Sequence, residues 1–274
     1  MSVHFTPRPA VLVIGGTGKT GRRVAERLAS LGHSVRIGSR SSEPSFVWED
    51  TGSWKAALDG VDAVYLTHPD ITVPGSGEQI AAFSRAAVDS GVRRLVLLSA
   101  RGDATLHTIE EGVRNSGADW TVVRPGWFNQ NFSEGFFLDA VLAGEIVLPV
   151  GDVAEAFVDI DDIADVVVAA LTDDRHIGKT YELSGPRLLT FADVAEELSR
   201  ATGREITYIP LTPEQFRASL RENGLPEDLA DGYAQNLDGR NAYLVHGVEE
   251  ALGRTPRDFS DYAREATATG VWNP

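Results

Sequence analysis

Three glycines, Gly15, Gly18 and Gly21, follow a short apolar run and come directly before an amphipathic one. A tight turn needs residues without a Cβ, and such a turn lets a pyrophosphate approach the free backbone amides at the start of a helix. The GxxGxxG spacing between a strand and a helix therefore predicts a dinucleotide-binding turn over 15–21. The alternative is a glycine turn with a purely structural role, which the flanking strand and helix patterns disfavour.

The tripeptide Gly18-Lys19-Thr20 also occurs in the phosphate loop of nucleoside triphosphatases. That motif requires a further glycine five residues before Gly18, where this chain has Val13 inside the apolar run. We therefore reject the triphosphatase interpretation.

The end of the second apolar run indicates which cofactor is preferred. An acidic residue there suits the ribose hydroxyls of NAD, whereas an arginine suits the additional phosphate of NADP. Here the run ends Gly38-Ser39-Arg40, and the first carboxylate after it is Glu43. Arg40 can pair with a phosphate and Ser39 can donate to it, so we expect NADP(H) rather than NAD(H). A solvated loop arginine is the alternative.

Composition narrows the class of protein. The 274 residues are 42% hydrophobic, enough for a large core, and carry a formal net charge of −15. That charge repels phosphate backbones and anionic lipid, so we expect no nucleic acid and no membrane as partner. The absence of cysteine excludes disulfides and thiolate metal sites. The N-terminus shows neither a secretory pattern nor a membrane span, so a cytoplasmic location is expected.

Apolar runs alternate with helical patterns along the first half of the chain. The runs cover 10–15, 34–39, 63–68, 94–100 and 120–125, and the helical patterns cover 20–31, 54–58, 77–90 and 106–116. This order predicts an α/β fold with a Rossmann-type, doubly wound parallel sheet. After Pro125 we expect a helix over 132–143, a strand over 157–160, a helix over 162–171, a strand over 180–183, a helix that begins near Thr190, and a helical tail over 212–274.

Two regions are predicted from this pattern. Residues 1–125 form the NADP-binding domain, with 153–183 returning to its sheet, and residues 126–152 and 184–274 form a smaller, mostly helical substrate-binding region.

Several segments in this order resemble the NmrA-like branch of the atypical short-chain dehydrogenase/reductases. They are GGTGKTGRRVAERL, FVWED, WKAAL, GVDAVYL, LVLLSA, SGADWTVVRPGWFNQNF, FVDIDDIADVVVAAL and GKTYELSGP. The GGTGKTG, WFNQNF and TYELSGP segments look most like the group of ergot-alkaloid reductases and NAD(P)H-binding proteins. The similarity extends to about Gly203.

The resemblance implies positions for the cofactor. The pyrophosphate would lie against Gly15, Thr17, Gly18, Lys19 and Thr20. The ribose phosphate would meet Ser39 and Arg40, the adenine would lie near the segment from Trp48 to Asp50, and the central ribose would lie beside Thr67, His68 and Pro69. Ser99 and Ala100 would flank the nicotinamide ribose, and the segment from Pro125 to Asn129 would close over the nicotinamide.

The catalytic residues of the family transfer only in part. Short-chain dehydrogenases carry a serine and a Tyr-x-x-x-Lys pair, and in this sequence Ser99 stands at the position of the serine. Residues 101–111 contain neither tyrosine nor lysine, and Asp103 and His107 lie near the missing positions. We expect Ser99 and His107 to be catalytic, with a polar surface histidine as the alternative. Glu110 is expected to be an exposed carboxylate.

An aromatic cluster follows the fifth apolar run and is the candidate substrate wall, although about half of it should be core. Its members are Trp127, Phe128, Asn129, Phe132 and Phe136. No metal site is expected, because the aspartates around Asp161 fit helix capping.

Two functions remain open from the sequence. The first is an NADPH-dependent reductase of an imine, ketone or quinone in specialised metabolism. The second is a non-catalytic NADP(H)-binding redox sensor of the NmrA type. The expected partner is a small-molecule substrate, and a homodimer is the candidate assembly.

Overall fold

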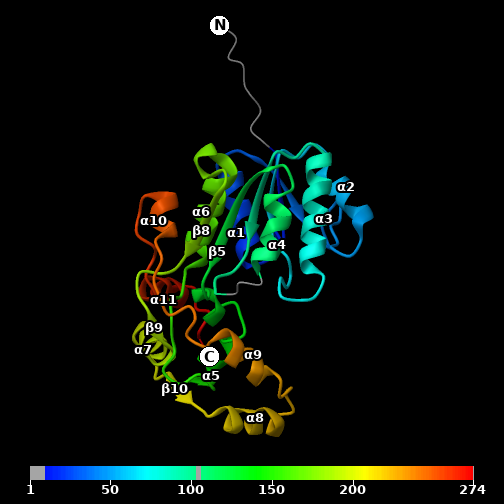
Figure 1. Ribbon diagram of the computed structural model, residues 1–274. Coiled ribbons are helices and arrows are strands. Elements are labelled where there is room, and N and C mark those ends of the chain that lie inside the picture. The colour runs from blue at the N-terminus through cyan, green and yellow to red at the C-terminus, as the bar shows by residue number, and fades with distance from the viewer. Residues whose placement is uncertain (1–9, 103–105, 274) are drawn as a thin grey trace. The chain divides into compact units, whose positions relative to one another are not determined.

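The computed structural model describes residues 10–102 and 106–273. Its largest element is a six-stranded sheet with the strand order β2-β1-β3-β4-β5-β8 (Figure 1). The strands are β1 (Ala10–Ile14), β2 (Ser34–Gly38), β3 (Ala63–Leu66), β4 (Arg94–Leu98), β5 (Asp119–Pro125) and β8 (Lys179–Leu183). The pairs that join β2, β1, β3, β4 and β5 are all parallel. The predicted Rossmann-type fold is confirmed.

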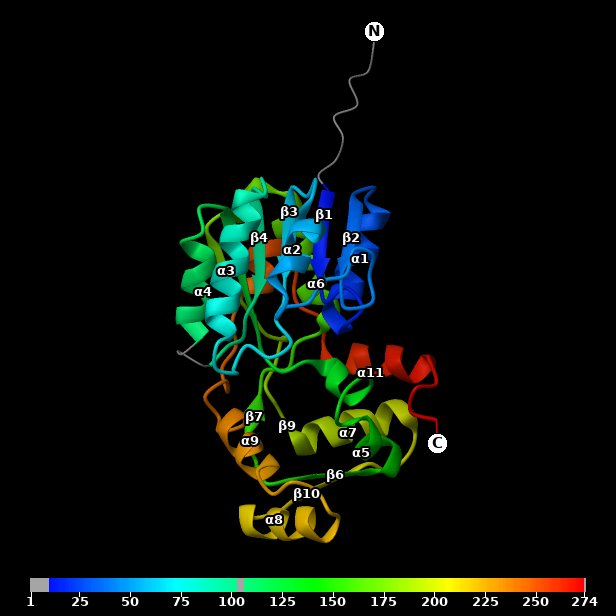
Figure 2. The same cartoon turned by 90° about the vertical axis from the view of Figure 1, so that its right-hand side faces the viewer.

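Helices cover both faces of this sheet. Figure 1 shows α2 and α3 on one side of the sheet and α6 on the other, and Figure 2 gives the view at a right angle, with α1 labelled beside β2. On the α1 side, the Arg27 guanidinium lies 2.6 Å from Asp161 and 2.7 Å from Asp165 of α6, so these two helices are tied together. The helices of this unit are α1 (Lys19–Ser30), α2 (Thr51–Leu58), α3 (Ser76–Asp89), α4 (Leu106–Arg114), α6 (Ile160–Thr172), η2 (Asp174–His176) and α10 (Gly247–Leu252).

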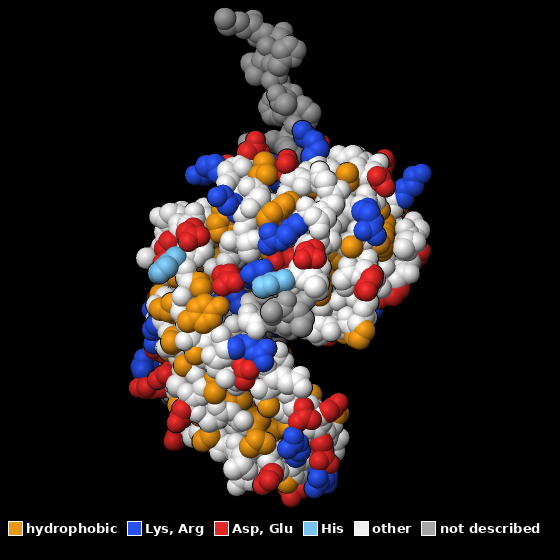
Figure 3. All heavy atoms as spheres, viewed as in Figure 1, with side chains coloured by type: hydrophobic (Ala, Val, Ile, Leu, Met, Phe, Trp, Pro, Cys, Tyr) orange, Lys and Arg blue, Asp and Glu red, His pale blue; other side chains and the backbone are white. Residues whose placement is uncertain are grey.

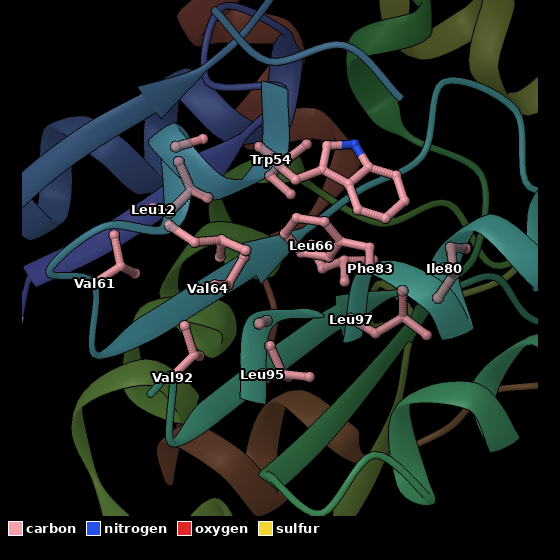
Figure 4. Packing of buried hydrophobic residues seen from close by; sticks show 14 of the residues in the cluster. Leu12, Trp54, Val61, Val64, Leu66, Ile80, Phe83, Val92, Leu95 and Leu97 are labelled. Atoms are coloured by element: carbon pink, nitrogen blue, oxygen red, sulfur yellow. The ribbon is translucent and has the colours of Figure 1, made fainter. Parts of the chain in front are cut away.

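The core between the sheet and α2 and α3 explains why the strands read as uninterrupted apolar runs. Strand residues that point to this face pack against helix residues in Figure 4, where Trp54 and Phe83 lie over Leu66. A strand covered on both faces has no solvent side on which a polar residue would be favoured. The labelled residues of this core are Leu12, Trp54, Val61, Val64, Leu66, Ile80, Phe83, Val92, Leu95 and Leu97.

The remaining elements are short and form a second compact unit. Strand β6 (Glu145–Leu148) pairs in parallel with β10 (Thr207–Pro210), and β7 (Ala154–Glu155) pairs antiparallel with β9 (Leu189–Thr190). The helices are η1 (Asn129–Phe132), α5 (Leu138–Ala143), α7 (Phe191–Thr202), α8 (Pro213–Glu222), α9 (Leu229–Asn236) and α11 (Phe259–Ala268). Their core is rich in aromatic rings, among them Phe132, Phe137, Phe157, Phe191 and Phe259.

The internal contacts divide the chain into these two units. The sheet unit comprises the described residues up to 125 together with 161–182 and 247–253, and the second unit comprises 126–160, 183–246 and 254–273. Residues 153–160 therefore group with the second unit, whereas we expected them to return to the sheet with the rest of 153–183.

Two predicted elements differ from the structure. The helix expected over 132–143 is a 3-10 turn (Asn129–Phe132) followed by the short helix α5 (Leu138–Ala143), because Phe132 and Phe137 both turn into the core. The strand expected over 157–160 is a single bridge between Val158 and Phe128, and α6 already begins at Ile160. The helix predicted near Thr190 is confirmed, with a capping box between Thr190 and Asp193.

The surface is charged and mixed. On the face shown in Figure 3, acidic and basic side chains alternate over both units. No helix among residues 10–102 and 106–273 combines the length and the apolar character needed to cross a bilayer.

Candidate functional site

The turn between β1 and α1 is shaped to receive an anion. Helix α1 begins at Lys19, and its cap residue Gly18 has no side chain to bond the first amides. The first turn carries no acidic residue. The partial positive charge at a helix start attracts a phosphate group, and neither a capping side chain nor an acidic residue of the first turn competes with it.

The glycines of this turn are required by close backbone contacts. Gly15 has φ +67°, and a Cβ there would lie 2.6 Å from the Thr67 hydroxyl. A Cβ on Gly21 would lie 2.2 Å from the carbonyl oxygen of Gly15. A side chain at Gly21 would force the start of α1 away from the end of β1, whereas a side chain at Gly15 would be strained by the positive φ and would clash with Thr67 after β3.

Thr20 fastens the start of α1 to the sheet. The Tyr65 hydroxyl of β3 donates to the Thr20 hydroxyl at 3.0 Å, and both residues are buried. The Thr67 hydroxyl donates to the Ile14 carbonyl oxygen at 3.1 Å, which joins the ends of β1 and β3. The turn is therefore held in place by neighbouring strands as well as by its own glycines.

A cavity of about 580 Å³ opens above this turn, at the carboxyl ends of β1, β2 and β3. This is the edge of a parallel sheet where ligands bind in open α/β folds. The structure brings together here the predicted residues Gly15, Thr17, Gly18, Lys19, Thr20, Ser39, Arg40, Trp48, Thr67, His68 and Pro69. Phe46, Val47 and Leu98 also line the cavity and were not predicted. The position of Leu98 near the carboxyl end of the 94–100 run was a signal that could have identified it.

The end of β2 contributes a basic side chain to the cavity. Arg40 is exposed, and it forms no ion pair with any other residue that the structure describes. Ser39 is anchored through its backbone, since its amide donates to the Ser42 hydroxyl at 3.0 Å and its carbonyl accepts from the Phe46 amide at 2.8 Å. The loop thus holds Ser39 in place and leaves the Arg40 guanidinium available to an anion.

Trp48 and His68 form the opposite wall. Their ring centroids lie 5.0 Å apart, and Trp48 packs further on Phe46 and Phe83 in the core. The His68 ring is held by the Asp70 carbonyl at 2.6 Å and by the Gln79 side chain at 2.9 Å. This wall is aromatic and rigid, which suits a flat base such as adenine.

Ser99, Ala100 and Pro125 lie beyond this cavity, at the ends of β4 and β5. The Pro125 carbonyl accepts a hydrogen bond from the Arg101 amide at 3.1 Å, which joins the two strand ends. Ser99 is buried beside the Glu110 carboxylate. Their predicted contact with a nicotinamide ribose stays a prediction.

Glu110 is buried, so the expectation of an exposed carboxylate was wrong. Arg124 of β5 donates to both of its oxygens at 2.7 Å, and Arg114 donates at 3.1 Å. Burial alone would raise the pKa of the Glu110 carboxyl, but the side-chain hydrogen bonds from Arg124 and Arg114 outweigh it and hold the pKa below its usual value. The carboxylate therefore stays ionised inside the fold.

The two predicted catalytic residues are not joined. His107 lies exposed in the first turn of α4, whereas Ser99 is buried, and no hydrogen bond links them among the residues that the structure describes. Asp103 lies outside the described residues. The Tyr181 hydroxyl is not available as a replacement acid there, since Tyr181 is buried, forms a hydrogen bond with His176 at 2.9 Å and does not line the cavity.

The predicted substrate residues separate into core and surface. Phe132 is fully buried among Phe137 and Phe157 and belongs to the core, so its placement in a substrate wall was wrong. Phe136 is 58% exposed and meets the partly buried Trp127 edge to face at 5.8 Å.

The other two predicted substrate residues lie on the same segment. Phe128 forms the bridge to Val158, and Asn129 is buried. Trp127 and Phe136 thus form an aromatic wall, with Asn129 two residues beyond Trp127.

Comparisons with known proteins agree with this architecture. The model of the NmrA-like family matches residues 7–263. A Streptomyces griseus (4-alkanoyl-5-oxo-2,5-dihydrofuran-3-yl)methyl phosphate reductase is 36% identical over 93% of this chain and 97% of its own. Agroclavine dehydrogenase of Claviceps fusiformis is 33% identical over 93% and 96%. The structure of Citrobacter sp. triphenylmethane reductase with NADP(H) superposes with a TM-score of 0.75 at 21% identity, over 94% and 99%.

Proposed function

The chain belongs to the NmrA-like family, and on that premise we propose that it is an NADPH-dependent reductase that delivers hydride to a small organic substrate. The observation that carries the proposal is the cavity above the β1–α1 turn, where uncapped helix amides and the Arg40 guanidinium meet. Relatives named as a reductase and a dehydrogenase, similar over nearly their whole length, support it.

The residues of the cavity fit a phosphorylated dinucleotide. The glycine turn packs the start of α1 closer to the end of β1 than a Cβ on Gly21 would permit, and amides at the start of a helix suit a pyrophosphate. Arg40 and Ser39 suit the ribose phosphate that distinguishes NADP from NAD. Trp48 and His68 supply the wall for adenine. When bound, the cofactor supplies the hydride, and the chain's own residues bind and orient it.

We propose that the substrate is partly aromatic and carries an imine, ketone or quinone. The Trp127–Phe136 wall supports an aromatic ligand, and the two relatives are named for a dihydrofuran phosphate and for agroclavine. A wall of two rings at right angles offers a flat ligand both a ring edge and a ring face.

The proton requirement separates these substrates. A ketone needs hydride on carbon and a proton on oxygen, whereas an iminium ion becomes a neutral amine on hydride addition alone. Residues 101–111 provide neither tyrosine nor lysine, and Ser99 and His107 stay proposed donors that lie apart in the structure. Positioning of donor and acceptor would then supply much of the rate enhancement, which favours the iminium.

The second candidate is a non-catalytic sensor that binds NADP(H) and changes its affinity for a partner. The missing Tyr-x-x-x-Lys pair favours the sensor, since a sensor needs the cofactor-binding cavity but no proton donor. The two candidates differ in turnover and in whether a protein partner depends on the cofactor.

The test is NADPH consumption with a panel of cyclic imines, aromatic ketones and quinones. We expect turnover with at least one class. Tight NADPH binding without turnover on any of them, together with a partner captured only in the presence of NADP, would replace the reductase by the sensor.

Arg40→Ala tests the cofactor preference. A charge-assisted hydrogen bond to phosphate contributes about 1.5–3 kcal/mol, so the variant should bind NADPH roughly 10–100-fold more weakly and NADH almost unchanged. Arg264→Ala, which removes an exposed arginine of α11, serves as the control and should alter neither affinity. Equal affinity of the wild type for both cofactors would refute the NADP assignment.

A further inference from the structure

Asn129 stands out among the buried polar side chains. It is 1% exposed, and neither the nitrogen nor the oxygen of its side-chain amide has a hydrogen-bond partner among residues 10–102 and 106–273. Its backbone is fixed, because its amide donates to the Val158 carbonyl at 2.9 Å. A buried amide that leaves both a donor and an acceptor unmade destabilises the fold, and such groups in native proteins call for an explanation.

The next residue shows that the segment can satisfy a buried amide. Gln130 is 3% exposed, its nitrogen donates to Asp159 at 2.9 Å, and its oxygen accepts from the Ile160 amide at 2.9 Å. Two neighbouring amides with nearly equal burial thus differ completely in their hydrogen bonds. Gln130 fastens η1 to the start of α6, and Asn129 contributes no such bond.

Along the chain, Asn129 lies close to an aromatic pair. Trp127 and the exposed Phe136 form the aromatic wall, and Asn129 follows on the same segment. A mostly apolar site with one or two fixed polar groups is the usual composition of a small-molecule pocket, in which the polar groups set orientation.

We infer that the Asn129 amide is the polar anchor of the substrate site and recognises a neutral carboxamide or carbonyl group on an aromatic ligand. This rests on the proposed function for the identity of the ligand as substrate. The Asn129 nitrogen donates to the carbonyl oxygen of the ligand, and the Asn129 oxygen accepts from an N–H group where the ligand has one. A charged group is disfavoured, because a buried neutral amide does not compensate a charge.

The probes are 1-naphthamide, which carries a carboxamide and contains no group of the three proposed reducible classes, and naphthalene, which lacks the polar group. Binding to the NADPH complex is followed by tryptophan fluorescence. We expect the wild type to bind 1-naphthamide at least about tenfold more tightly, because a site built for a hydrogen bond rejects the analogue that lacks it.

Asn129→Leu removes both hydrogen-bonding atoms and keeps the branched shape. It should bind the two probes equally and unfold at the same temperature as the wild type or higher, since it removes an unsatisfied group. Asn129→Ala serves as the second variant if leucine overfills the site. Gln130→Leu is the matched control, and it should keep the preference for 1-naphthamide while it lowers the unfolding temperature.

The outcomes separate the two proposals. A wild type without preference for 1-naphthamide, or an Asn129→Leu variant that keeps the preference or is destabilised like Gln130→Leu, overturns the inference. Preference that depends on Asn129 in a protein that turns over no member of the substrate panel supports the anchor and overturns the reductase instead.

Discussion

Replacement of Gly21 by alanine tests the phosphate cradle directly. A Cβ at this position would lie 2.2 Å from the carbonyl oxygen of Gly15 and 2.9 Å from the Cα of Gly16, whereas ordinary contact begins at 3.4 Å. Both neighbours are backbone atoms, so no side-chain rotation relieves the clash. The start of α1 must move away from the end of β1.

The size of the effect follows from that displacement. Extra atoms in a packed interior cost about 1–3 kcal/mol, and the rigid neighbours here place Gly21→Ala at the upper end, so the free energy of unfolding should fall by about 3 kcal/mol. The displaced amides no longer converge on the pyrophosphate. Since each 1.4 kcal/mol is a factor of ten in affinity, we expect the Kd for NADPH to rise about 100-fold.

Two further glycines provide the controls. A Cβ on Gly18 would lie 3.2 Å from the Gly15 oxygen, so Gly18→Ala should fall between the wild type and Gly21→Ala. Gly232 in α9 has nothing within 4 Å of an added Cβ, and alanine there should stabilise the helix by up to about 1 kcal/mol without effect on NADPH binding.

The assays are urea unfolding and NADPH fluorescence titration. A Gly21→Ala protein that binds NADPH within about threefold of the wild type, a difference below 1 kcal/mol, and that unfolds at the same urea concentration would refute the reasoning. Close approach of the helix to the strand would then not be what the cofactor requires.

Two other predictions concern stability. Glu110→Gln leaves the Arg124 guanidinium without its buried counter-charge, so the free energy of unfolding in urea should fall by about 3 kcal/mol. The control Glu227→Gln changes an exposed ion pair and should lower the free energy of unfolding by under 1 kcal/mol. Equal losses in the two variants would contradict the burial argument. Burial lowers the pKa of His176 from its ordinary 6.5, against the opposing effect of Asp173, so the folded protein resists its protonation. As the pH falls below 6.5 the unfolded chain takes up this proton first, and stability should fall. His176→Gln should flatten the pH dependence of the unfolding temperature between about pH 5 and 7, and an unchanged slope would assign the loss to other groups.

The sheet and the cofactor cavity could be predicted because their signals are local. The inner strands β1, β3, β4 and β5 are largely buried and therefore contain apolar runs, and the turn at Gly15 is recognised within seven residues. The second unit gives weaker signals. Strands β7 and β9 have two residues each and exist only through their pairing, which no periodicity reveals.

Glu110 shows the same limit for a single side chain. We expected a solvated carboxylate on α4, although its spacing from Leu106 and Val113 puts it on the buried face of the helix; the helical pattern gives no sign of its partner. That partner, Arg124, lies 14 residues along the chain on the neighbouring strand, and the two meet only because β5 runs beside α4. For Phe132 the prediction of a substrate contact was wrong, because this aromatic residue near the predicted site is buried in the core.

The difference between local and long-range signals also decides how the function is best approached. The cradle is made from one turn and the ends of its neighbouring strands, so a change there acts on cofactor affinity and on stability together, as at Gly21. The substrate side depends on side chains such as Asn129 whose missing partners only the folded structure reveals. Because the removal of an unsatisfied amide need not destabilise the fold, a substitution of Asn129 can change ligand affinity without lowering the unfolding temperature. Such a variant can identify the ligand chemistry before any substrate is known.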